Sequence, residues 1–324
     1  MTLVFYDRTS NLYHMCVKGC EHSDQRSRMN SKVSVIVPVY NDPDGIRKLL
    51  AALVEQSYPK QLYEIIVVDN GSTDGTLDAA KKYQDAYPDL IRVLVEDSVQ
   101  SSYAARNMGV QASHGEIVAM IDADCTPIPE WIERGVHALE TQEADLVGGK
   151  VTFVFSSKPD PAELYDAMTN IQMKRDIDLR GVAKTANLFA RRTVFNEIHY
   201  FPAHLKSGGD VIWTGEATNA GFVLIYSSKA EVFHPTRKLE ALLRKQYRVG
   251  GGQLAIWKSQ GCGFLYILKV LITGFFPANP WRIRKLIREF EGLEMQKGLG
   301  VLVWLVAWLC KLATSLGRIR ALVL

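Results

Sequence analysis

Two carboxylates, Asp122 and Asp124, stand one small residue apart at the end of an apolar run over residues 117–121. A buried strand that delivers two acids at its carboxyl end makes a rigid site rich in oxygen ligands, which Mg²⁺ and Mn²⁺ prefer. Such a cation completes its coordination shell with water and with the oxygens of a diphosphate. The same residues also suit a strand that ends in a polar turn, so the pair by itself leaves both interpretations open.

Strand-like and helix-like segments alternate through the first part of the chain. Runs of β-branched residues at 33–37 and 64–68 predict two strands, and further strands are expected at 91–95 and 116–121. Between the first two, Ile46, Leu49, Leu50 and Leu53 have the spacing of one face of a helix. This order predicts an α/β fold with a mostly parallel sheet and helices on both faces.

Three groups of polar residues fall at the carboxyl ends of these predicted strands, where ligands bind in open parallel sheets. Their convergence on one edge favours a binding site over a chance pattern. The residues are Pro38, Tyr40 and Asn41 after the first strand, Asp69 after the second, and Asp122 with Asp124 after the fourth.

Composition restricts the class of protein. The 38 basic and 35 acidic side chains nearly balance, so no nucleic-acid-binding surface is predicted. Five scattered cysteines suit a reducing compartment. Residues 1–31 are polar and aperiodic, which predicts a flexible leader without a signal peptide. The spacing of its metal-binding residue types fits no common zinc finger; they are His14, Cys16, Cys20 and His22.

The second part of the chain is less regular. A helix is expected from the segment Ser207–Asp210 to Asn219, with Gly221 as its stop. The other expected elements are an extended run at 145–155, a helix at 160–175, a mixed segment at 182–190, strands at 223–226 and 230–234, and a helix at 239–247 interrupted by Gly250–Gly252.

Beyond Gly261 the chain becomes apolar. Residues 264–276 contain one charge and residues 299–310 none, and each run is shorter than the ~20 residues of a spanning helix. We therefore expect two helices that lie in the interface of the cytoplasmic leaflet of the inner membrane. A spanning helix and a homodimer surface are the alternatives. Basic residues of the connector would favour anionic lipid; they are Arg282, Arg284, Lys285 and Arg288.

Four segments, taken in order, resemble the nucleotide-binding half of family 2 glycosyltransferases, which have the GT-A fold. They are Ser34–Asn41, Ile66–Thr76, Ala105–Gly109 and Asp122–Asp124. The resemblance implies a GT-A domain at 32–255, with a nucleotide-binding half at 32–125 and an acceptor half at 126–255. A helical membrane-associated segment would follow at 256–324.

The resemblance also implies roles on the donor side. Asp69 would accept the imide N–H of uracil, which implies a UDP-sugar, and Asp122 and Asp124 would bind the ribose and the metal, Mn²⁺ or Mg²⁺. His234 stands where related transferases place a third metal or diphosphate contact. The residues alone leave structural roles open, such as a turn at Asp69. The expected nucleotide-sugar ligands are Pro38, Tyr40, Asn41, Asp69, Asp74, Arg106, Asp122 and Asp124.

On the acceptor side, Asp210 resembles the family's catalytic base. The family commonly has Gly-Glu-Asp at this helix start, whereas Gly209 replaces the glutamate here, and a helix cap would also suit Asp210. Gln246 and Arg248 resemble a motif of processive members, but the tryptophan that should follow is absent. The residues expected to line the acceptor side are Thr185, Ala186, Asn187, Gln246 and Arg248.

These features predict a metal-dependent, inverting glycosyltransferase that moves a sugar to a saccharide or a lipid-linked acceptor for cell-surface polysaccharide or glycolipid. A sugar nucleotidyltransferase is an alternative, but it would need a Gly-rich, basic loop after the first strand, where Pro38–Pro43 offers none. A non-catalytic scaffold is the other alternative, disfavoured because all the expected acids are present.

Overall fold

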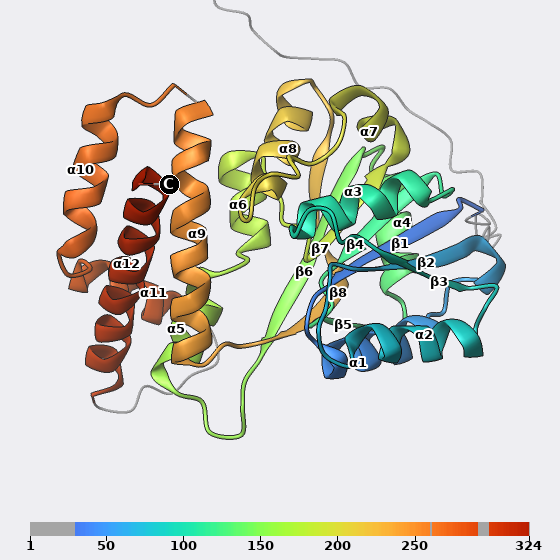
Figure 1. The fold of residues 1–324 in the computed structure, drawn as a ribbon, viewed down its shortest axis with the longest axis horizontal. Coiled ribbons are helices and arrows are strands. Elements are labelled where there is room, and N and C mark those ends of the chain that lie inside the picture. Colours follow the sequence, from blue (N-terminus) through green and yellow to red (C-terminus); the bar gives the residue numbers. More distant parts are fainter. Residues whose placement is uncertain (1–29, 260, 291–297, 324) are drawn as a thin grey trace, which may run out of the picture.

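The computed structural model describes residues 30–259, 261–290 and 298–323. The cysteine- and histidine-bearing part of the leader therefore lies outside the described residues. A mixed sheet of eight strands forms the centre, in the order β3-β2-β1-β4-β7-β6-β8-β5. Helices cover both of its faces, and the C-terminal helices stand together at one end of the molecule (Figure 1).

The first half of the sheet is parallel, as predicted. The strands β1 (Val33–Val39), β2 (Tyr63–Asp69), β3 (Ile91–Val95) and β4 (Ile117–Ile121) run in one direction, so their carboxyl ends share one edge. The second half is mixed, because β7 (Asn187–Arg191) pairs antiparallel with both β4 and β6. The remaining strands are β5 (Thr126–Pro127), β6 (Leu146–Val154) and β8 (Leu224–Pro235).

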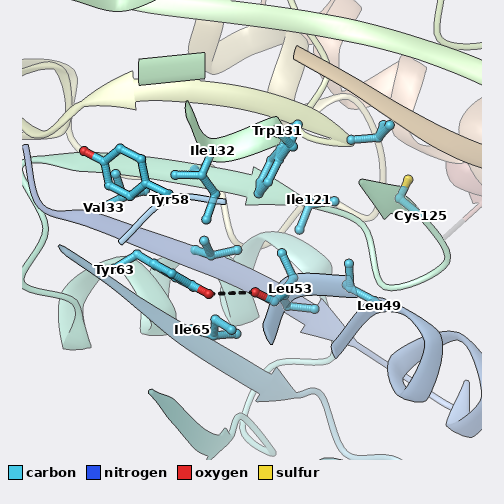
Figure 2. Packing of buried hydrophobic residues seen from close by; sticks show 14 of the residues in the cluster. Val33, Leu49, Leu53, Tyr58, Tyr63, Ile65, Ile121, Cys125, Trp131 and Ile132 are labelled. Atoms are coloured by element: carbon cyan, nitrogen blue, oxygen red, sulfur yellow. Dashed lines mark hydrogen bonds between the residues drawn. The ribbon is translucent and has the colours of Figure 1, made fainter. Parts of the chain in front are cut away.

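Two apolar layers enclose the parallel strands. On one face, β1 packs with α1 (Pro43–Val54), α2 (Thr76–Ala86) and α4 (Trp131–Thr141). Figure 2 shows this layer, in which the Tyr63 hydroxyl donates to the backbone oxygen of Leu53 at 2.9 Å. The other face packs under α3 (Ser102–Ala112), α7 (Arg192–Ile198) and α8 (Gly209–Asn219). Strands buried on both faces form a rigid base for their polar ends.

The helix α1 illustrates how local sequence forms these elements. The Asp42 side chain accepts from the Gly45 N–H, and Pro43 occupies the first turn, where its missing N–H costs nothing. The predicted apolar face is confirmed, because its four residues are fully buried: Ile46, Leu49, Leu50 and Leu53.

Two elements predicted for the second half are wrong. The expected helix at 160–175 is two helices, α5 (Pro161–Thr169) and α6 (Met173–Arg180), and Ile171 between them has a left-handed φ of 45°. The two expected short strands are one strand, β8. The mixed segment contains the strand β7. Long-range pairing decided these cases, since β7 and β8 are completed by partners distant in sequence.

The glycines expected to interrupt a helix lie inside α9 (Leu239–Ser259). One of them, Gly250, is required by α12 (Leu299–Val323), which crosses α9 closely. A Cβ atom on Gly250 would lie 2.0 Å from the Thr314 oxygen, and one on Gly317 would lie 2.0 Å from the Tyr247 oxygen. Only glycine lets the two backbones approach this far, so the third correction has a tertiary cause.

The C-terminal helices combine a packed face with an exposed apolar one. Between α10 (Phe264–Phe275) and α12, the basic connector forms α11 (Pro280–Glu289). Residues Leu299–Leu322 of α12 are long and apolar enough to cross a membrane by length and composition, longer than the run expected from the sequence, and a third of the stretch is buried. Phe264 and Leu265 on α10 are 74% and 79% exposed. The buried part of α12 packs on α5 and α9.

Candidate active site

A small pocket of about 260 Å³ lies at the carboxyl ends of β1 and β2. Tyr40, 48% exposed, stands at its edge, where an aromatic ring can stack on a planar base. The pocket is lined by Pro38, Val39, Tyr40, Asn70, Gln100, Ser101, Ser102, Lys206 and Arg248.

Asp69 ends β2 beside this pocket, paired in register with Val39. One carboxylate oxygen, Oδ2, accepts from the Ser72 N–H at 2.9 Å, so the turn considered from the sequence is present. The other oxygen, Oδ1, is buried and has no hydrogen-bond partner among the described residues. A buried unsatisfied acceptor is costly, and a ligand N–H would satisfy it.

Asn41 joins the loops that follow β1 and β2. Its backbone is left-handed, with φ of 48°, and its side-chain oxygen accepts from the Thr73 N–H at 2.8 Å. Its own N–H donates to the Ser72 hydroxyl. Asp74 is exposed and accepts from the Thr76 N–H at 2.9 Å, just before the N-cap residue Gly75. Both residues therefore shape the loop, and neither lines the described pockets.

Asp122 and Asp124 diverge after β4. Asp122 Oδ1 forms an ion pair of 2.5 Å with Arg106 on α3, whose side chain is 4% exposed. Arg106 also donates to the Ser102 backbone oxygen, while its Nε is buried and has no hydrogen-bond partner in the described part of the chain. Asp122 is thus engaged by Arg106, and the expectation that both acids bind one metal stays a prediction.

Asp124 instead faces His234 at the end of β8. Asp124 Oδ2 lies 3.5 Å from His234 Nε2, and the imidazole is fully buried. His234 Nδ1 lies 2.6 Å from the Pro235 carbonyl oxygen, which can only accept. Nδ1 therefore donates to this carbonyl, and Nε2 is the ring nitrogen that faces Asp124. A carboxylate and an imidazole form a donor set that fits Mn²⁺.

Cys125 also belongs to this cluster, whose ligand atoms lie within 4.8 Å of one another. Burial raises the pKa of the Cys125 thiol well above its ordinary value, and the charges of Asp124 and Asp122 add to the effect. A thiol that stays protonated is a poor metal ligand. The side chains that fit a cation are therefore Asp124 and His234.

Asp210 lies in the first turn of α8, after Gly208, which is the N-cap with a φ of 84°. Its Oδ1 accepts from the Tyr103 hydroxyl at 3.1 Å and from the Val211 N–H at 3.0 Å. Burial, followed by the charge of Asp210, raises the pKa of Tyr103 well above its ordinary value, so the phenol remains a donor. Asp210 Oδ2 has no hydrogen bond among the described residues.

Tyr103 also explains why Gly209 stands where the family commonly has a glutamate. A Cβ atom there would lie 2.9 Å from the Tyr103 ring, so no side chain fits. Tyr103 thus takes the space that a glutamate would need and holds the neighbouring aspartate. The sequence offered no signal for this contact, because the two residues are 107 positions apart.

A cleft of about 520 Å³ joins the elements of the site. It is lined by Asp122 and Asp210, and by Arg237, which contacts both Asp124 and His234. Its walls are strongly basic, because Lys206 and Arg248 have no acidic partner within 4 Å among the described residues. The basic residues of the lining are Arg106, Arg180, Lys184, Lys206, Arg237, Lys245 and Arg248.

Only some of the residues expected on the acceptor side line the cleft. Thr185, Ala186 and Arg248 line the cleft. Asn187 does not, because its amide is buried and donates to the Lys150 and Ala230 oxygens. Gln246 faces α12, where Thr314 donates to it at 3.3 Å. Sequence reasoning missed four residues of the site, for which only an isolated charge or ring was visible: Tyr103, Lys206, Arg237 and Lys245.

A nucleotide-sized pocket at parallel strand ends, an Asp-Ala-Asp segment and an aspartate across a shared cleft define a GT-A nucleotide-sugar transferase. The chain belongs to glycosyl transferase family 2, whose family model matches residues 34–203. It is therefore a glycosyltransferase. The GT-A fold inferred from the sequence resemblance is confirmed.

Curated relatives share this activity. The chain is 44% identical over 290 residues to glycosyltransferase AglE of Haloferax volcanii, covering 89% of this chain and 95% of that protein. It is 29% identical over 193 residues to the poly(ribitol-phosphate) beta-glucosyltransferase of Bacillus spizizenii, of which only 29% is covered. The second likeness therefore concerns a part of a larger protein.

Two solved structures show the same fold. TarS 1–349 of Staphylococcus aureus in complex with UDP is 25% identical, with a TM-score of 0.51, and the match covers 68% of this chain and 64% of that one. The mannosyltransferase PcManGT from Pyrobaculum calidifontis, in complex with GDP-Man and Mn²⁺, is 21% identical, with a TM-score of 0.58, covering 90% and 87%. The fold thus accommodates different nucleotides.

Proposed function

We propose that this protein transfers a sugar from a UDP-sugar, with inversion and with the help of a divalent cation, to a hydroxyl of a saccharide or lipid-linked acceptor. The observation that carries the proposal is that the proposed base and the proposed diphosphate-binding residues line one cleft. Asp210 lines it from α8, together with Asp122 and with Arg237, which contacts Asp124. A base and a diphosphate-binding group in one cleft are what an in-line displacement requires.

Asp210 is the proposed catalytic base. Its Oδ1 is held by the Tyr103 hydroxyl and the Val211 N–H, which keeps the carboxylate fixed and leaves Oδ2 for the acceptor. Oδ2 takes the acceptor's proton as the oxygen attacks the anomeric carbon. The bond from that carbon to the diphosphate breaks, and UDP leaves with the electron pair.

The proposed donor is a UDP-sugar because of Asp69. Its Oδ2 is engaged by Ser72, so one unsatisfied oxygen remains for a base. Uracil offers a single imide N–H, whereas guanine presents two adjacent donors to a carboxylate. The relative TarS 1–349 has been solved with UDP, which supports the choice. Lys206 and Arg248 border both the base pocket and the cleft, and the diphosphate would pass between them.

The proposed cation would be held by Asp124 and His234. When bound, Mn²⁺ or Mg²⁺ supplies positive charge to the departing diphosphate. Asp122, paired with Arg106, is left for the ribose and the nucleotide phosphates. We propose this division of the two acids in place of the expectation that both bind the metal.

The C-terminal helices are proposed to attach the enzyme to the cytoplasmic leaflet of the membrane. Exposed apolar side chains of α10 and basic side chains of α11 suit an anionic lipid surface. Because α12 packs on α5 and α9, α12 is part of the folded unit that carries the site. A dimer surface is the alternative that the membrane experiment below distinguishes.

The test measures the release of the nucleoside diphosphate: UDP from a panel of UDP-sugars and, as a comparison, GDP from GDP-mannose. Each reaction is run in Mn²⁺ and in EDTA. We expect slow hydrolysis of one UDP-sugar in Mn²⁺ and none in EDTA. Equal release in EDTA would contradict the metal dependence, and release from GDP-mannose alone would contradict the nucleotide. Each result thus bears on a separate part of the proposal.

A further inference from the structure

The helix α5 carries two fully buried carboxylates that play no part in the chemistry above. Glu163 and Asp166 are 1% and 0% exposed. Glu163 is satisfied locally, since it accepts hydrogen bonds from the Ser156 and Asp160 backbones and from the Thr236 hydroxyl. Asp166 differs, because the charged groups that face it come from the lining of the cleft. A buried charge without compensation would be strongly destabilising, so these partners matter.

Asp166 is compensated by Arg237 and Lys245. Its Oδ2 accepts from the Arg237 backbone N–H at 3.0 Å and lies 3.6 Å from Arg237 Nη1. Its Oδ1 lies 3.8 Å from Lys245 Nζ on α9, and the Asn170 side chain donates to the same oxygen. Asp166 thus fixes both the backbone and the guanidinium of Arg237.

The guanidinium of Arg237 extends from Asp166 toward the proposed metal ligands. Its Nη2 lies 3.4 Å from Asp124 Oδ2 and 3.2 Å from His234 Nε2. Its Nη1 is buried and has no hydrogen-bond partner among the described residues. This Nη1 is the atom that lies 3.6 Å from Asp166 Oδ2. Arg237 also lines the cleft, so its guanidinium can meet a ligand oxygen there.

We propose that Arg237 binds a phosphate oxygen of the donor's diphosphate and that Asp166 is a positioning residue that fixes Arg237 for this contact. The inference rests on the proposed function and names a further donor contact in the same site. Guanidinium groups form charge-assisted, bidentate bonds to phosphate. The contact would strengthen as the diphosphate gains negative charge on leaving.

The proposal separates phosphate binding from base binding, so two probes test it. The Kd values of UDP and of uridine are measured by calorimetry in Mn²⁺ for the wild type, Arg237→Gln, Arg237→Lys and Asp166→Asn. Arg244→Gln is the matched control, because Arg244 lies on exposed α9 surface in a pair with Glu240. Melting temperatures check that each variant is folded.

We expect Arg237→Gln to weaken UDP binding roughly 10- to 100-fold, the worth of a charged hydrogen bond, and to leave uridine binding within about twofold. Arg237→Lys should recover part of the loss. Asp166→Asn should weaken UDP binding by less, on the order of 3- to 10-fold. In the double variant Asp166→Asn/Arg237→Gln, the loss should equal that of Arg237→Gln alone, because Asp166 acts through Arg237.

Wild-type UDP affinity in folded Arg237→Gln would overturn the proposal. So would a parallel loss of uridine binding, which would indicate a structural role. If the effect of Asp166→Asn persists undiminished in the Arg237→Gln background, Asp166 is not the positioning residue. Should Asp166→Asn fail to fold, Arg237→Gln and Arg237→Lys still decide the phosphate contact. A wild type that binds no UDP would overturn the proposed function, and this inference with it.

Discussion

Residues 32–125, the proposed nucleotide-binding half, and residues 126–255, the proposed acceptor half, build their parts of the site differently. In the nucleotide-binding half, Asp69, Asp122 and Asp124 stand at or just after the ends of β2 and β4. In the acceptor half, Asp166, Arg237 and Lys245 come from α5, from the loop after β8 and from α9. The first arrangement is imposed by neighbouring parallel strands. The second exists only when distant helices pack, so it depends on the C-terminal helices as well.

The halves also differ in charge. On the nucleotide side, Arg106 neutralises Asp122, and Asp69 is held by a backbone N–H. On the acceptor side, the cleft has more basic than acidic side chains, and Lys206 and Arg248 lack acidic partners among the described residues. A surplus of positive charge there would favour anionic ligands and the leaving diphosphate.

The largest expected effect comes from a substitution in the acceptor half that should lower turnover without changing UDP binding. Asp210→Asn should lower turnover by roughly two to four orders of magnitude, because a general base is lost, while the Kd of UDP stays near the wild-type value. Single-turnover kinetics and calorimetry measure the two quantities. If UDP affinity falls with activity, Asp210 is a donor ligand or a structural residue and the two halves are not separable in this way.

The corresponding change in the nucleotide-binding half is Asp124→Asn. Turnover should fall on the order of 10²- to 10³-fold, and the gain in UDP affinity that Mn²⁺ provides should disappear, because an amide is a poorer ligand. Asp122→Asn is the matched variant, and it should weaken UDP binding while keeping the response to Mn²⁺. Equal responses of both variants would show that the acids share one role.

The exposed face of α10 tests whether the C-terminal helices meet lipid. The double change Phe264→Ser/Leu265→Ser should reduce binding to anionic liposomes roughly 10-fold or more, because two exposed apolar side chains are removed. Leu179→Ser is the control, since Leu179 is 73% exposed on α6. A wild type that ignores liposomes and sediments as a dimer would instead assign this face to a second copy of the chain.

Glycine pairs test the packing that joins α12 to the site. Gly317→Ala should lower the melting temperature by several degrees, because its Cβ would strike the Tyr247 backbone. Gly300→Ala in the same helix meets only ordinary contacts, with its nearest atom at 3.9 Å, and should leave stability unchanged or improve it. Equal melting temperatures for both variants would mean that α12 does not support α9.

The smallest expected effect concerns pH and α5. Burial tends to raise the pKa of Glu163, but hydrogen bonds from Ser156, Asp160 and Thr236 outweigh it and lower the pKa to about 2. Its contribution to stability is therefore complete above its ordinary pKa of 4.5 and is lost as the pH falls toward 2. Urea unfolding of the wild type and Glu163→Gln should give different stabilities at pH 7, and the difference should shrink as the pH falls toward 2. A constant difference would contradict the lowered pKa.

Much of the nucleotide-binding half could be predicted from the sequence. The period of apolar residues gave α1 and its buried face, and the positions of Asp69, Asp122 and Asp124 followed from the strand ends. These features depend on contacts close in sequence or between adjacent strands. The contacts behind the proposed division between Asp122 and Asp124 could not be predicted, because they are made by Arg106 from α3 and by His234 from β8.

The sequence by itself determined the family, the parallel sheet and the edge where the acids gather, because strand period and motif order are local properties. Only the tertiary structure decided that Gly209 makes room for Tyr103, that Gly250 and Gly317 form a helix crossing, and that Asn187 and Gln246 face away from the cleft. Each of these depends on a partner more than 40 positions away. Contacts at that separation arise from the packing of whole elements, which leaves no periodic trace in the chain.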